Sequence, residues 1–124
     1  MTTIAWQRAE GAIIFLAALV LYGFLDDGFA WWLAIVLFFV PDLSFLAYGF
    51  GPKVGAVAYN AVHVFAFGIV LLVAGIVAGS TILSALGALW LGHSGFDRML
   101  GYGLKSPDGF TVTHLGAIGG PSGR

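Results

Sequence analysis

The chain has 124 residues, of which 60% are hydrophobic and only 9% are charged. Five Lys and Arg against six Asp and Glu give a net charge of −1, which argues against binding to nucleic acid. There is no cysteine, so disulfides and thiolate chemistry are excluded. Because so few charges cannot cover the exterior of a soluble domain, the composition predicts an integral membrane protein surrounded by a lipid bilayer.

Apolar runs of about 20 residues recur, the length that an α-helix needs to cross a bilayer. We expect one helix over residues 4–25, ending at an LDDG turn, and a second over 31–49, opening with a Trp pair. The breaker cluster GFGPK precedes a third helix over 54–78, and a GST turn precedes a fourth over 81–100. Residues 101–124 are expected to be a short irregular segment. The predicted fold class is all-α, a single transmembrane domain built as a four-helix bundle.

The cationic residues predict the orientation of this bundle. When four helices are threaded through a membrane, all of them fall at the same edge: Arg8, Lys53, Arg98, Lys105 and Arg124. The opposite edge carries Asp26 and Asp27 and no cation. Because positive residues favour the cytoplasmic side, we expect a multi-pass protein of the bacterial inner membrane with both termini and the last segment in the cytoplasm.

Each predicted helix carries costly polar groups, and all of these fall in its cytoplasmic half. Along the chain they are Glu10, Asp42, Ser44, Tyr59, Asn60, His63, His93, Ser94, Asp97 and Arg98. His93 and Asp97 are four residues apart, so they share one helical face. Pro41 removes a helical hydrogen bond and is expected to kink the second helix beside Asp42. Ionisable groups in membranes usually point inward, so we expect a shared pocket between the four helices.

Three segments carry a family resemblance: residues 41–63 (PDLSFLAYGFGPKVGAVAYNAVH), residues 93–105 (HSGFDRMLGYGLK) and the THLG of 113–116. The chain resembles the small bacterial membrane proteins grouped as domain-of-unknown-function family 4260. The resemblance covers nearly the whole chain and implies a compact multi-pass membrane protein. It implies no chemistry.

The polar residues themselves predict a metal site. His63, His93 and Asp97 offer two imidazoles and a carboxylate, ligands that suit divalent zinc, iron or manganese. The turn SPDGF is expected to fold the last segment back, which would make His114 a further ligand. Glu10 or Asp42 would be the catalytic base for water attacking an ester, amide or phosphoester of a lipid-like or small substrate. The remaining pocket-lining residues are Ser44, Tyr59, Asn60 and Arg98.

Two other functions fit the same residues. In a structural or interaction protein, the polar groups would only hold the helices together, for example by pairing Arg98 with Glu10 or Asp42. In a small homodimeric transporter, Glu10 would be the coupling group, although the outer halves of the helices offer no polar path. Small residues are spaced four apart at Ser80, Ser84, Ala88 and Gly92, and again at Gly75 and Gly79. These stripes would pack either the monomer or a homo-oligomer.

Overall fold

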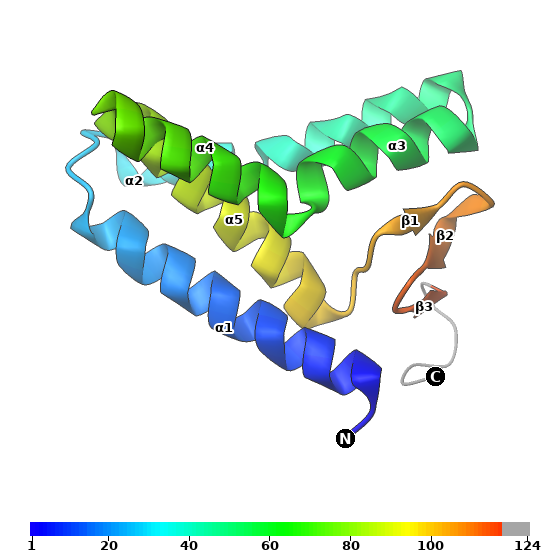
Figure 1. The fold of residues 1–124 in the computed structure, drawn as a ribbon. Coiled ribbons are helices and arrows are strands. Elements are labelled where there is room, and N and C mark those ends of the chain that lie inside the picture. Colours follow the sequence, from blue (N-terminus) through cyan, green and yellow to red (C-terminus); the bar gives the residue numbers. More distant parts are fainter. Residues whose placement is uncertain (118–124) are drawn as a thin grey trace.

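The computed structural model describes residues 1–117, and Figure 1 shows that this part is mostly helical. The helices are α1 (Thr3–Phe24), α2 (Trp31–Phe38), the 3₁₀ helix η1 (Val40–Phe50), α3 (Pro52–His63), α4 (Phe65–Ala78) and α5 (Thr81–Leu100). Three short strands follow: β1 (Lys105–Ser106), β2 (Gly109–Thr113) and β3 (Gly116–Ala117). The two helices expected over 31–49 and 54–78 are each divided into two, and both divisions position the site.

The first division follows from Pro41. This residue lies in the first turn of η1, where its missing N–H costs no helical hydrogen bond. The chain therefore ends α2 at Phe38 and continues as η1. The two together still run as one helical segment, Trp31–Phe50, so the kink expected beside Asp42 stays a prediction. The second division lies between α3 and α4, where Val64 adopts extended backbone and the two helices differ in direction by 46°. Neither Pro nor Gly is present there, and the cause is given with the site below.

Helix α5 lies at the centre of the fold and packs against both α1 and α4. Small residues allow the close approach. A Cβ on Gly95 would lie 2.7 Å from the carbonyl oxygen of Gly11 on α1, and one on Gly75 would strike Ser84. Of the predicted small-residue stripe, Ser84 therefore packs against Gly75 of α4, whereas Gly92 faces Phe38 of α2 and Ala18 of α1. Gly79 does not share in it, because this glycine ends α4 with a left-handed φ of 67°.

Gly87 offers a direct test of this packing. A Cβ there would strike the backbone of Leu72 on α4, which cannot move aside as a side chain would. We expect Gly87→Ala to lower the free energy of unfolding by about 1–3 kcal/mol, measured by titrating a denaturing detergent into neutral micelles. Gly23→Ala is the matched control, because a Cβ at this α1 position meets nothing within 4 Å. Equal stability of the two variants would contradict the close α4–α5 contact.

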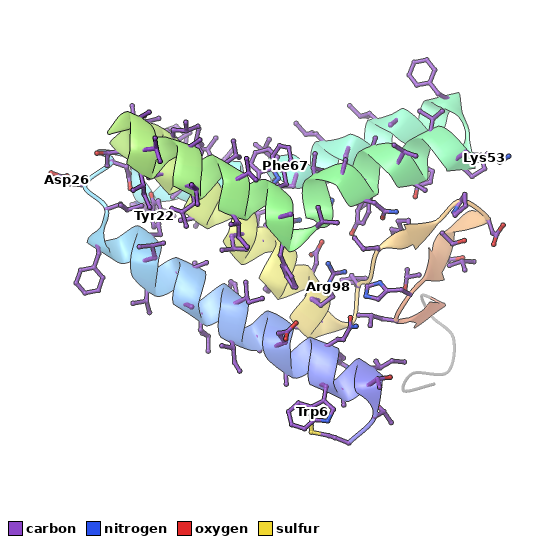
Figure 2. All side chains as sticks on the ribbon, viewed as in Figure 1. Trp6, Tyr22, Asp26, Lys53, Phe67 and Arg98 are labelled. Carbon is purple, nitrogen blue, oxygen red and sulfur yellow. The ribbon has the colours of Figure 1, made fainter. Side chains whose placement is uncertain are left out.

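Apolar side chains cover the outside of the helices. Phe24 is 85% exposed and Val77 82%, and Figure 2 shows Trp6 pointing away from its neighbours. By length and composition, α1 and the combined α2–η1 helix (Trp31–Phe50) could cross a membrane, and α3–α4 makes a third span if the bent pair counts as one. These helices indicate a membrane protein. The four expected spans are not all confirmed, because α5 is less apolar than the helices around it.

The segment after α5 is not irregular as expected. Its strands form an antiparallel sheet in the order β1-β2-β3, and the turn between β1 and β2 is stabilised by Ser106 and Asp108. This sheet packs against α3, and the predicted all-α class is confirmed because helices still make up most of the chain. The sequence prediction failed because the strands are too short to show a period. The final residues, 118–124, lie outside the described part of the chain.

Candidate metal centre

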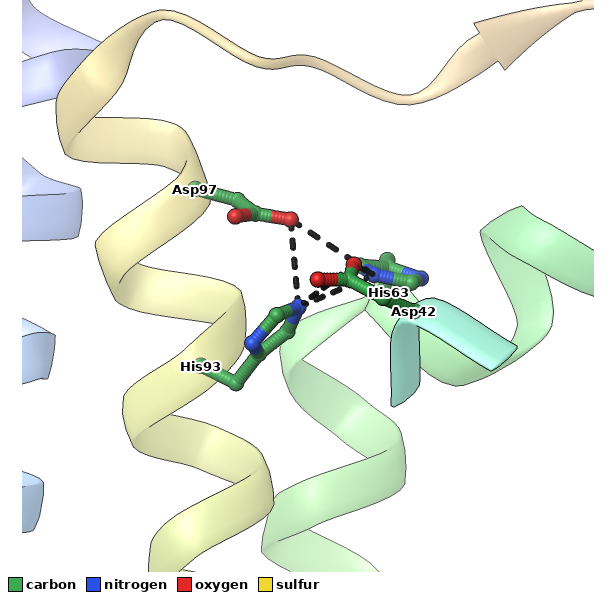
Figure 3. Close-up of side chains that lie close together, drawn as sticks. All are labelled: Asp42, His63, His93 and Asp97. Atoms are coloured by element: carbon green, nitrogen blue, oxygen red, sulfur yellow. Dashed lines mark hydrogen bonds and ion pairs between the residues drawn. The ribbon is translucent and has the colours of Figure 1, made fainter. Parts of the chain in front are cut away.

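Four side chains converge from three elements: Asp42 from η1, His63 from α3, and His93 with Asp97 from α5 (Figure 3). His93 Nε2 lies 3.1 Å from Asp42 Oδ1 and 3.3 Å from Asp97 Oδ2. His63 Nε2 lies 3.4 Å and 3.5 Å from the same two oxygens. The two Nε2 atoms are 3.2 Å apart, and all four donor atoms lie within 4.8 Å of one another. We call these four residues the Asp/His cluster.

The break between α3 and α4 places His63 in the cluster, and α5 stabilises the break. Arg98 Nη2 donates to the carbonyl of His63 at 3.2 Å, and Trp90 Nε1 donates to the carbonyl of Val62 at 2.9 Å. Arg98 is buried and its guanidinium lies 5.1 Å from the centroid of the Phe65 ring. Because a broken helix leaves carbonyls unpaired, non-helical backbone inside a membrane protein needs such donors. Two side chains of α5 therefore cause α3 and α4 to separate at this point.

The partners of His63 determine which nitrogen faces the cluster. His63 Nδ1 lies 2.8 Å from the carbonyl oxygen of Tyr59, which can only accept a hydrogen bond. Nδ1 therefore donates to this carbonyl, and Nε2 faces the other three residues. The Tyr59 ring stacks on the His63 ring at 3.7 Å, and the Tyr59 hydroxyl donates to Asp97 Oδ2 at 3.3 Å. Histidines that bind metals are usually oriented by such outer hydrogen bonds.

Burial differs among the four residues. The side chain of His93 is 0% exposed, that of His63 2% and that of Asp97 13%, whereas Asp42 is 34% exposed. His93 packs against the rings of Phe38 and Phe39, and its Nδ1 has no hydrogen-bond partner among the described residues. The cluster is therefore closed on the histidine side and open beside Asp42.

The donor spacing fits a tetrahedral ion. Zinc binds imidazole nitrogen and carboxylate oxygen at about 2.0–2.2 Å, so neighbouring donors in a tetrahedron lie about 3.3–3.6 Å apart. Five of the six donor pairs in the cluster have separations of 3.1–3.5 Å. Calcium and magnesium prefer shells of oxygen atoms alone, so the two imidazoles favour a transition metal or zinc.

Glu10 does not reach the cluster. Its side chain is exposed on α1 in a surface groove with Trp6 and Ile13. The neighbouring Gly11 is the residue that faces α5, so the close contact with Gly95 rotates Glu10 outward. Of the two predicted bases, the structure therefore brings only Asp42 to the histidines. Ser44 lies two residues beyond it, with an Oγ that has no hydrogen-bond partner among the described residues.

Asn60 connects the cluster region to the sheet. Its Oδ1 accepts from the backbone N–H of Lys105 at 2.6 Å, and its Nδ2 donates to the Lys105 carbonyl at 2.8 Å. Lys105 is only 4% exposed, and its Nζ lies 5.0 Å from the centroid of the Tyr59 ring. Sequence reasoning used Lys105 only as a marker of membrane orientation. Nothing in the local pattern signals a contact across 45 residues.

His114 also lies away from the cluster. The SPDGF turn between β1 and β2 folds the segment back, as expected, but His114 then lies beside the start of α1. The backbone N–H of Leu104 donates to His114 Nδ1 at 2.8 Å, and His114 Nε2 donates to Gln7 Oε1 at 2.9 Å. Both ring nitrogens are therefore used in joining the last segment to α1, and the structure does not bring this predicted ligand to the other three.

The contact from Leu104 should depend on pH, because it requires an unprotonated Nδ1. Burial lowers the pKa of His114, and the charge of Arg98 lowers it further. The unfolded chain therefore takes up the proton first as pH falls, so this contribution to stability is complete above about pH 6.5 and is lost below it. We expect hydrogen exchange at the Leu104 amide, corrected for intrinsic rates, to be faster at about pH 5 than at about pH 7.5. His114→Ala should abolish that difference; a difference that persists would contradict the contact.

The fold and the site define the class of this protein. It is a membrane protein with a buried Asp/His cluster at a helix break. The family model described as a domain of unknown function, DUF4260, matches residues 4–118, and the chain belongs to this family. The resemblance seen in the sequence is thereby confirmed. No curated protein and no solved structure matches the chain.

Proposed function

We propose that the Asp/His cluster binds one divalent metal ion, with zinc preferred over iron and manganese, and that the site hydrolyses an ester or phosphoester of a lipid-like substrate. The observation that carries the proposal is the spacing of the donors. The three separations among His63, His93 and Asp97 are 3.2–3.5 Å and match the edges of a tetrahedron, whose fourth corner, beside Asp42, is left for water or substrate. These three donors lie on α3 and α5, and Asp42 reaches them from η1, within one membrane-type helical fold.

The membrane placement is part of the same proposal. Helix α5 would be the fourth span of a single transmembrane domain, shielded from lipid by α1 and α4, which explains its lower hydropathy. Arg8 Nε donates to the carbonyl of Met99 at 3.0 Å, so the start of α1 lies beside the end of α5. This contact supports the placing of both termini on one side, which the cationic residues favour as the cytoplasmic face of the inner membrane.

The difference in burial assigns the roles. His63, His93 and Asp97 are the closed side and serve as the permanent ligands, while Asp42 borders the open side and serves as the base. A bound divalent ion would polarise the substrate and lower the pKa of water. Asp42 takes one proton from the attacking water, whose oxygen bonds to the carbonyl carbon or phosphorus. The same proton then passes to the leaving alkoxide, so that water is added across the broken bond.

A structural role is the second candidate, because the same distances suit direct hydrogen bonds. His93 Nε2 at 3.1 Å from Asp42 Oδ1 is within the range of an N–H donor and a carboxylate. In that case the cluster would hold η1, α3 and α5 together without an ion. The two functions differ in one respect, which is whether the protein gains stability and activity from a metal.

The test uses full-length protein in neutral maltoside micelles. Metal is removed with a chelator and then restored as zinc, and hydrolysis of p-nitrophenyl butyrate and bis(p-nitrophenyl) phosphate is followed by colour. We expect hydrolysis of at least one probe to disappear with the metal and to return with zinc. Asp26→Asn is the control, since Asp26 lies at the α1–α2 turn, away from the cluster (Figure 2). Protein that binds no zinc, or zinc protein that is inactive on both probes, would contradict the proposal.

A further inference from the structure

Lys105 is placed beside the cluster by two constraints on its backbone. Both its N–H and its carbonyl are bonded to the side chain of Asn60, at 2.6 Å and 2.8 Å. Asn60 precedes His63 by three residues on α3, so the position of β1 is fixed relative to the cluster. In Figure 3 the chain that leaves α5 runs across the cluster toward β1. An amide bonded in this way to the N–H and the carbonyl of one residue imitates a neighbouring strand.

The side chain of Lys105 points toward the same residues. Its Nζ lies 5.0 Å from the centroid of the Tyr59 ring, and the Tyr59 hydroxyl is bonded to Asp97. Burial lowers the pKa of Lys105, while the carboxylates of Asp97 and Asp42 raise it. Both carboxylates of the cluster are therefore within electrostatic reach of the ammonium group.

The charges of the site leave a surplus once a divalent ion is added. Asp42 and Asp97 supply two negative charges, and Lys105 and Arg98 supply two positive ones, so the four side chains balance. A divalent ion then adds two positive charges in a place with little water. Buried net charge is costly unless an opposite charge compensates it. The ammonium of Lys105 is a buried cation beside the cluster, 5.0 Å from the centroid of the Tyr59 ring whose hydroxyl is bonded to Asp97.

We propose that Lys105 and the bound ion together form an anion site, and that the substrate is a phosphate ester rather than a neutral ester. This inference rests on the metal site of the proposed function. The ammonium of Lys105 donates to a phosphate oxygen while the ion holds another, so the phosphorus lies where water activated beside Asp42 can reach it. A neutral carboxylic ester would leave the surplus charge uncompensated.

The test uses cobalt in place of zinc, because the visible absorption of bound Co²⁺ reports a new ligand. Cobalt protein in neutral maltoside micelles is titrated with inorganic phosphate, and separately with phosphatidic acid mixed into the micelles. We expect phosphate groups to change the spectrum, with Lys105→Met binding about tenfold or more weakly, as expected for a lost charge-assisted hydrogen bond. Lys105→Arg should keep most of the affinity. Lys53→Met is the matched control, since Lys53 is exposed at the far tip of α3 (Figure 2).

The outcomes separate the two proposals. Cobalt that binds while phosphate has no effect leaves the metal site standing and overturns the anion site. Equal phosphate affinity of Lys105→Met and the wild type overturns it as well. If Lys105→Met binds no cobalt, the phosphate affinity of Lys105→Gln is compared with that of the wild type instead. If the wild-type protein binds no cobalt, the metal site is contradicted, and the anion site is contradicted as well. A response to phosphatidic acid at concentrations where inorganic phosphate has none assigns the group to a lipid headgroup, and equal responses assign it to free phosphate.

Discussion

An Asp42→Asn variant should keep its metal ion and lose its activity. The substitution preserves the shape of the side chain but removes the group that takes the proton from water. General bases contribute about 10²–10⁴-fold to rate, so we expect hydrolysis to fall by that factor with little change in zinc content. Both quantities are measured on the same purified sample, by colour release from the responsive p-nitrophenyl probe and by elemental analysis.

Asp97→Asn should behave differently, although the chemical change is the same. Asp97 is 13% exposed against 34% for Asp42, and it is oriented by the Tyr59 hydroxyl. As a permanent ligand, its loss should remove the ion and the activity together. Asp26→Asn, at the α1–α2 turn, should change neither. The assignment of roles is wrong if Asp42→Asn loses the ion and Asp97→Asn retains it.

Arg98→Met should give the largest loss of stability among substitutions that leave all four cluster residues in place. Arg98 is 5% exposed and donates to the His63 carbonyl at the break between α3 and α4. Methionine keeps much of the bulk but leaves that carbonyl unpaired. A buried unsatisfied polar group costs about 1–3 kcal/mol, and the lost contact of the guanidinium with the Phe65 ring adds to it.

The measurement is the midpoint of unfolding in mixed detergent micelles. Metal is first removed with a chelator, so that metal binding does not contribute to the midpoint. Lys53→Met removes an exposed cation of α3 by the same change of residue and should leave the midpoint where it is. An Arg98→Met midpoint equal to that of Lys53→Met would show that the helix break does not depend on Arg98.

The sequence predicted the members of the cluster but not their arrangement. His93 and Asp97 are four apart on a helix, so their common face follows from helical geometry alone. Asp42 and His63 were placed at a similar depth by counting residues from the turns. Helical spacing and depth together therefore predict all four residues of the cluster, with Asp42 as a base rather than a ligand.

Glu10 and His114 could not be placed from the sequence, for different physical reasons. Beyond Gln7, Arg8 and Glu10 near its start, α1 is apolar on every side. The composition of its faces therefore does not predict which face turns toward α5, and the contact between Gly11 and Gly95 determines this. The position of His114 depends on a sheet of two- and five-residue strands, which are too short to show a period. The break at Val64 has no Pro or Gly to mark it, because its causes, Trp90 and Arg98, lie on another helix.

Metal analysis of protein purified without chelator tests the central claim most directly. The wild-type chain and a His63→Ala, His93→Ala double variant are purified side by side in neutral detergent, and zinc, iron and manganese are quantified against protein. We predict about one divalent ion per chain in the wild type and none in the double variant. Wild-type protein that carries no ion, and takes up none when zinc is supplied, would contradict the metal centre.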